Sequence, residues 1–172
     1  LVTVENGQDQ ISLNPDPYRQ VQTGYTQLNL LQKIQWKPTK LSTFDYGFHY
    51  STTSDVPRYD RLVEKRNDQL RFARWNYGPQ EWLMNNLKWT FRGSSRWFDQ
   101  VKLIAAHQFF AESRIDRRFG DSREYERRER VNAYSVNADF LKNFSESNYL
   151  SYGVEWVHNQ VQSSGIEKDI FS

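Results

Sequence analysis

Four aromatic residues at every second position limit how this chain can fold more than any other feature. Phe44, Tyr46, Phe48 and Tyr50 alternate with the small or polar residues Asp45, Gly47, His49 and Ser51. Alternate side chains of a strand share one face, whereas the same spacing in a helix spreads them around the axis. The run therefore predicts a β-strand with one aromatic face and one polar face.

Five other segments alternate less cleanly and bring the predicted strands to six: Tyr25–Trp36, Leu83–Phe91, Val101–Phe110, Tyr134–Phe140 and Leu150–Trp156. A helix over about Glu124–Lys142 is the main alternative, because Val131, Tyr134 and Ala138 also fit a helical spacing. Charged pairs four residues apart upstream would support that helix. We favour the strand because strands are predicted on both sides of it.

The predicted connections alternate strictly between short and long. The short ones are Lys37–Lys40, Gly93–Ser95 and Asn143–Asn148; the long ones are about Ser54–Pro79, about Glu112–Arg127, and Val161 onward. In an antiparallel meander this order places tight turns at one end and long loops at the other. That asymmetry is typical of outer-membrane β-barrels, with short periplasmic turns and long extracellular loops. The predicted fold is thus all-β, an antiparallel segment of a transmembrane barrel with about six long strands.

Composition and motifs exclude several other classes. Aromatic residues make up 16% of the 172 residues, which argues against disorder despite a mean hydropathy of −0.87. The net charge of +2 is low for a nucleic-acid-binding protein, and the absence of cysteine excludes disulfides and thiolate metal sites. Phosphate-binding glycine loops, zinc-protease motifs and nucleophile elbows are absent, so no enzyme activity is predicted. The three histidines lack metal-site spacing, and neither metal nor cofactor is predicted.

Both ends of the chain fall on the predicted long-loop side, even if Val2–Val4 and Ile11–Leu13 form a hairpin around Asn6-Gly7. A complete barrel normally has both termini on the short-turn side. Residues 1–172 are therefore predicted to be one fragment of a larger outer-membrane barrel domain. The aromatic row of Phe44 would face lipid, and His49 with its neighbours would face the lumen.

Three segments carry a resemblance to a known family: GYTQLNLLQKI at 24–34, TTSDVPRYDRL at 52–62 and LRFARWNYGPQEWLM at 70–84. Together with the order of strands and loops, they resemble the barrel of TonB-dependent outer-membrane receptors over roughly Asn14–Arg130. The resemblance implies a plugged barrel of about 22 strands in the outer membrane of a Gram-negative cell. It also implies contact with the lipid bilayer and lipopolysaccharide.

The same resemblance implies import of a scarce nutrient, such as an iron chelate or siderophore, haem or a cobalamin-like ligand, driven by the TonB complex. No plug domain and no TonB-contacting segment occurs in these residues. The parts that couple energy to transport are therefore expected in the parent protein, outside this chain.

Arginine and aromatic residues interleave in the long connection Ser54–Pro79, a combination that suits anionic or planar ligands. The predicted ligand-binding residues are Arg58, Tyr59, Arg61, Arg71, Arg74, Trp75 and Tyr77. The alternative is a loop whose arginines pair with its own carboxylates. The charged run Arg114–Arg130 has mixed signs, which favours self-pairing over contact with lipopolysaccharide phosphates.

Two other functions are compatible with the same strands. One is a soluble all-β module that binds carbohydrate or protein through its tryptophan and tyrosine side chains. The other is a small, self-contained outer-membrane barrel with a lipid-modifying or adhesive role.

Overall fold

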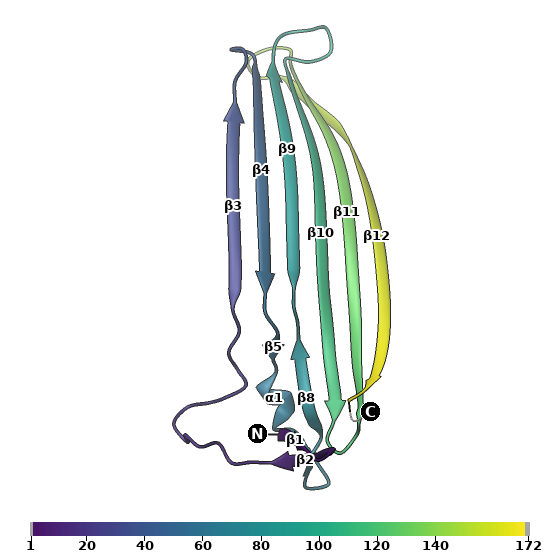
Figure 1. Ribbon diagram of the computed structural model, residues 1–172. Coiled ribbons are helices and arrows are strands. Elements are labelled where there is room, and N and C mark those ends of the chain that lie inside the picture. Colours follow the sequence, from purple (N-terminus) through teal and green to yellow (C-terminus); the bar gives the residue numbers. More distant parts are fainter. Residues whose placement is uncertain (1, 171–172) are drawn as a thin grey trace.

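Six long strands form the main sheet of the computed structural model, which describes residues 2–170 (Figure 1). They are β3 (Gln27–Trp36), β4 (Ser42–Thr53), β9 (Glu81–Arg92), β10 (Gln100–Arg118), β11 (Arg123–Asn143) and β12 (Tyr149–Asp169). Each long strand pairs antiparallel with the next one along the chain, in the order β12-β11-β10-β9-β4-β3. The predicted all-β meander of six strands is confirmed.

The sheet is open within the described residues, because β3 and β12 lie at opposite edges and do not pair with each other. The segment Glu124–Lys142 is part of strand β11, so the helical alternative is excluded. No helix of the described residues is long and apolar enough to cross a membrane; the only helix, α1 (Tyr59–Leu62), has four residues.

Three short connections lie together at one end of the sheet, the upper end in Figure 1. They comprise residues 37–41, 93–99 and 144–148, as the sequence predicted, although the second is longer than expected. The opposite end carries the long connection between β4 and β9 and the two described ends of the chain (Figure 1).

Two of the predicted long loops are wrong. Residues 112–127 instead continue β10 and β11, which join through a turn at 119–122, and Val161 onward continues β12 to Asp169. Charges on both strands hid the pairing, because Arg127 forms an ion pair with Asp116 across it and Glu124 lies directly opposite Arg117. Cross-strand charge pairs stabilise a ladder that has no apolar face, so hydrophobic alternation cannot reveal it.

The long connection between β4 and β9 is confirmed over 54–80 and contains small elements. These are β5 (Val56–Pro57), α1, the hairpin of β6 (Lys65–Arg66) and β7 (Gln69–Leu70), and β8 (Phe72–Tyr77). Strand β8 pairs with the far half of β10, where β9 has ended. At Gly78, a side chain would collide with the backbone of Asp55, so glycine allows this close approach.

An N-terminal hairpin joins β1 (Val2–Glu5) to β2 (Gln8–Ile11) through Asn6-Gly7. Both turn residues have positive φ, 51° and 73°, which is the conformation that Asn-Gly favours in a two-residue hairpin. The hairpin was foreseen, but its second strand begins at Gln8 rather than Ile11.

The main sheet has an apolar face and a polar face. The apolar face carries a central row of Tyr46, Leu87, Ala105, Val136 and Trp156, and the polar face the adjacent row of Asp45, Lys88, Ile104, Asn137 and Glu155. On the central strands Leu87 and Leu103 stay 46% and 37% exposed. Among residues 2–170, the only buried hydrophobic residues are Phe72, Ala73, Val101 and Ile115. The described residues thus bury almost no apolar core of their own.

Candidate functional site

The predicted ligand-binding residues lie in the connection between β4 and β9, where they divide into three groups. In the first group the guanidinium of Arg58 lies over the rings of both Trp75 and Tyr77, 5.3 and 5.5 Å from their centroids. Arg58 also makes two hydrogen bonds to Asp60, of 2.7 and 2.8 Å. This bidentate contact raises the pKa of Arg58 and lowers the pKa of Asp60. The first group is therefore an arginine already held between two rings and one carboxylate.

The second group centres on Glu64, which forms ion pairs with Arg61 and Arg71. The hydrogen bond from Arg71 lowers the pKa of Glu64, and the bond from Arg61 adds to the effect. Arg61 also lies 5.9 Å from the ring of Trp75, which links the second group to the first. Tyr59 lies on α1, is 39% exposed, and makes none of these side-chain contacts.

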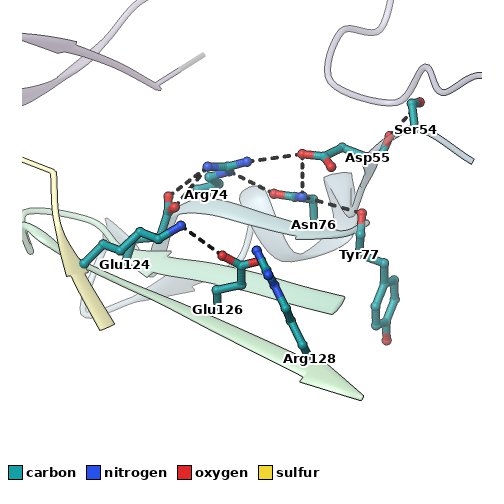
Figure 2. A network of polar contacts seen from close by, with 9 residues as sticks. Ser54, Asp55, Arg74, Asn76, Tyr77, Glu124, Glu126 and Arg128 are labelled. Atoms are coloured by element: carbon teal, nitrogen blue, oxygen red, sulfur yellow. Dashed lines mark hydrogen bonds and ion pairs between the residues drawn. The ribbon is translucent and has the colours of Figure 1, made fainter. Parts of the chain in front are cut away.

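The third group is Arg74 and its partners, on the opposite face of β8 from Trp75 (Figure 2). Arg74 donates two hydrogen bonds to Glu124, of 3.1 and 2.9 Å, and one of 3.2 Å to Asp55. Asn76 accepts a hydrogen bond from Arg74 and donates one to Asp55. Glu124 is on β11, so this network ties the long connection to the main sheet.

Glu126 continues the same charged cluster along β11 (Figure 2). Its carboxylate, 8% exposed, contacts Arg128 at 2.5 Å and Lys168 of β12 at 3.0 Å. Glu124 is 11% exposed, whereas Arg74, Arg128 and Lys168 are each more than 40% exposed. The carboxylates thus lie beneath, and their cationic partners point outward.

The structure therefore brings Arg58, Arg61, Trp75 and Tyr77 together and places Arg74 on another face. Each of the four arginines predicted to contact ligand is paired with at least one carboxylate. This geometry favours the alternative in which the loop satisfies its own charges. Ligand contact by these residues stays a prediction.

A buried ion pair that the sequence did not reveal fastens the N-terminal hairpin to the β10–β11 turn. The side chains of Arg117 and Asp9 are 4% and 1% exposed, and two hydrogen bonds of 2.9 and 2.6 Å join them. Asp9 also accepts the backbone N–H of Gly120. Burial alone would raise the pKa of Asp9, but the bonds from Arg117 and Gly120 outweigh it and lower that pKa. A separation of 108 residues concealed this pair from the sequence.

The three histidines take part in ring contacts, and His158 stacks on Trp156 of the same strand. His49 meets Trp82 edge-on on the polar face, while His107 stacks on Tyr134 and contacts Asn132 on the apolar face. Across residues 2–170, no group of three histidine, aspartate or glutamate side chains could hold a metal ion.

The apolar face forms a level band, because the strands are in register. At the short-turn end it is closed by seven rings whose neighbouring centroids are 5.0–6.3 Å apart: Trp36, Phe44, Trp89, Phe91, Phe98, Phe140 and Tyr152. At the other end, a charged row begins where Ala111 lies between Glu81 and Arg130. Polar side chains inside the band pair with one another, as Tyr46 does with Asn85 at 2.6 Å. The band is thus bounded at both ends. Within it, the Tyr46 hydroxyl and the Asn85 side-chain oxygen satisfy each other by this hydrogen bond.

A hollow of about 630 Å³ lies on the polar face, over β3, β4, β9, β10 and β11. Its lining includes Tyr25, Gln27, Ser51, Trp82, Gln108 and Phe110, none of which the sequence analysis predicted as a ligand-binding residue.

Among known proteins, no family model, no curated sequence and no solved structure matches the chain.

Proposed function

We propose that the chain is part of the transmembrane β-barrel of a TonB-dependent receptor in the outer membrane of a Gram-negative cell. The apolar band is the observation that carries the membrane part of this proposal. A soluble protein would have to cover the exposed leucine, valine and tryptophan side chains of this band with a core, and the described residues supply almost none. Lipid chains would cover it instead.

The dimensions of the band fit a bilayer. Ten residue steps separate Val101, under the aromatic row, from Ala111, in the first charged row. At about 3.3 Å per residue and a strand tilt of about 40° they span about 25 Å, close to the apolar height of about 25 Å for an outer-membrane barrel. Aromatic rings concentrate at membrane interfaces, which suits the row at the short-turn end.

The charged cluster beyond the band suits the lipid headgroup region. Its outward cations, Arg74, Arg128 and Lys168, stand on the same face as the band and one to three rows beyond its edge. Lipopolysaccharide phosphates are anions that would meet this surface if the long-connection end lies outside the cell.

The resemblance of residues 24–34, 52–62 and 70–84 supports the receptor part of the proposal. On this basis the parent protein imports an iron chelate, haem or cobalamin-like ligand, powered by the TonB complex through a plug outside this chain. The open edges of β3 and β12 would pair with further strands of the same barrel, because unpaired edges in lipid leave backbone groups unsatisfied.

Fractionation and transport test the two parts separately. The full-length protein should sediment with outer membranes, require detergent for extraction, and migrate faster on a gel before heating than after. Uptake of one of the named ligand classes should then disappear when TonB is deleted. Extraction into aqueous buffer without detergent would contradict the membrane part and favour a soluble binding module. A barrel that folds but supports no TonB-dependent uptake would contradict the receptor part alone.

A further inference from the structure

The hollow on the polar face combines three aromatic rings with a set of uncharged polar groups. Tyr25, Trp82 and Phe110 supply the rings, and the amides and hydroxyls come from Gln27, Gln80, Gln108, Ser51 and Thr53. Its volume of about 630 Å³ falls within the usual range of small-molecule sites, about 300–1,000 Å³.

Neighbouring side chains hold part of this lining in place. The ring of Trp82 meets His49 edge-on at 4.5 Å, and Trp82 lies directly opposite Ser51 on β4. Gln27 donates hydrogen bonds to Ser51 and to Asn29, which fixes one amide at the rim. The backbone N–H of Gln80 donates to the Thr53 hydroxyl. Such restraint lowers the entropy that binding must remove.

Two amides of the lining remain available to a ligand. Within residues 2–170 the side-chain amides of Gln80 and Gln108 make no hydrogen bond. Each amide offers donors and an acceptor together, the combination that recognises a hydroxyl group acting in both roles.

Charge separates this hollow from the arginine-rich connection. No lysine or arginine is in its lining, and the one carboxylate residue there, Glu81, belongs to the apolar-face row of Thr52 and Ala111. An anionic ligand would lose hydration here without gaining a counter-charge, which disfavours it. A neutral ring with hydroxyl groups would find an apolar surface for its C–H face and amides for its hydroxyls.

We propose that this hollow is a binding subsite for a neutral, hydroxyl-rich ligand of the size of one or two sugar rings. The inference rests on the proposed function, because the polar face then lines the barrel lumen through which a ligand passes. It adds a neutral, hydroxyl-rich ligand to the classes named under the proposed function, and it assigns the contacts with that ligand to Trp82 and Gln108 rather than to the paired arginines of residues 58–74.

An array of neutral oligosaccharides tests the assignment with the full-length protein in detergent micelles. The array contains gluco-, manno-, galacto- and xylo-oligosaccharides, with oligogalacturonate as the anionic comparison. Calorimetry then gives the affinity for the tightest neutral ligand. W82A removes one ring and Q108L one amide of similar size, so each should weaken binding about two- to tenfold.

Matched controls separate the site from general effects. W97A removes an exposed tryptophan from the turn at 93–99, and Q162L removes an exposed glutamine of β12 on the other face. Both should leave the affinity unchanged. No binding to any neutral oligosaccharide by a barrel that shows heat-modifiable migration would overturn the inference and leave the proposed function intact. Equal loss in W97A and W82A would also overturn it, whereas failure to behave as a membrane barrel would refute the proposed function itself.

Discussion

Replacing each of three alanines of β10 by arginine tests which face of the sheet contacts lipid and how deep each position lies in the proposed bilayer. Ala105 lies in the middle of the apolar band, between Leu87 and Val136, and its neighbour Ala106 lies on the polar face between Asn86 and Ser135. Ala111 is on the same face as Ala105 but in the row with Glu81 and Arg130. Each is replaced by arginine, so that the side chain introduced is the same and only its surroundings differ.

In the proposed membrane barrel, the cost of each arginine follows from its depth in the bilayer. On the lipid face of a barrel an arginine costs about 2–4 kcal/mol at the midplane and about 0–1 kcal/mol near the interface. Ala111 is six residues from Ala105, or about 15 Å along the membrane normal for a tilted strand. We therefore expect A105R to lower the free energy of unfolding by about 2–4 kcal/mol and A111R by about 1 kcal/mol or less. A106R would face the aqueous lumen and should also cost little.

Urea titration of the full-length protein in lipid vesicles, followed by tryptophan fluorescence, gives the three free energies of unfolding. Equal costs for A105R and A106R would refute the assignment of the two faces. Equal and large costs for A105R and A111R would refute the proposed position of the apolar face in a bilayer. If a protein core covered that face, the cost of an arginine would not fall from Ala105 to Ala111.

Three further outcomes follow from the described contacts. D9A should remove the three hydrogen bonds that Asp9 accepts from the buried Arg117 and from Gly120, cost about 3–5 kcal/mol in the attachment of the N-terminal hairpin, and speed proteolysis within residues 12–24. D16A, on an exposed loop, should not. Hydrogen bonds from Ser94, Asn143 and Lys142 lower the pKa of Asp99 from 3.8 to about 2. The stabilisation that Asp99 gives to the turn at 93–99 is therefore complete above about pH 4 and disappears as the pH falls through about 2. Hydrogen exchange of the Asn143 backbone N–H should follow that pH window in the wild type and not in D99N. Proteases added to intact cells should cut within 12–24 or 54–80 and spare 37–41 and 144–148. They should also spare 112–118 and 123–127, because these residues are paired strand. Cleavage at 37–41 would invert the proposed topology.

Hydrophobic alternation predicted the six strands because each has at least one apolar row near the short turns. Phe44–Tyr50 is the clearest case, and β4 extends only two or three residues beyond it at either end. Where the apolar rows stop, the alternation ends although the strands continue. Beyond Phe110 the ladder of β10 and β11 is held by pairs such as Asp116–Arg127, which look like a solvated loop in the sequence. Hydrophobic alternation reveals a strand only where one face is apolar and the other is polar. Beyond Phe110, β10 and β11 carry charged side chains on both faces.

The seven predicted ligand residues illustrate a different limit. Composition identified a segment rich in arginine and aromatic rings, and the structure does bring Arg58 between Trp75 and Tyr77. It could not identify their partners, since Glu124 is 50 residues from Arg74. The hollow on the polar face was missed because Tyr25 precedes β3, Trp82 lies on β9 and Gln108 lies on β10, and the three residues carry no motif. Only the register of the sheet places them together.

The two ends of the main sheet are stabilised by different means, and the difference has a physical cause. Near the short turns, side chains of the apolar face meet in a row of rings and are otherwise left uncovered, an arrangement that suits the proposed apolar medium. Beyond Ala111 the same face buries Glu124 and Glu126 beneath Arg74, Arg128 and Lys168. Strand β8, from the connection 54–80, pairs there with the edge of β10. Carboxylates enclosed by cations need water or headgroups nearby, because an uncompensated charge is costly in lipid. The change from rings to ion pairs along one face therefore locates the proposed membrane boundary at the row of Ala111, where A111R should be tolerated.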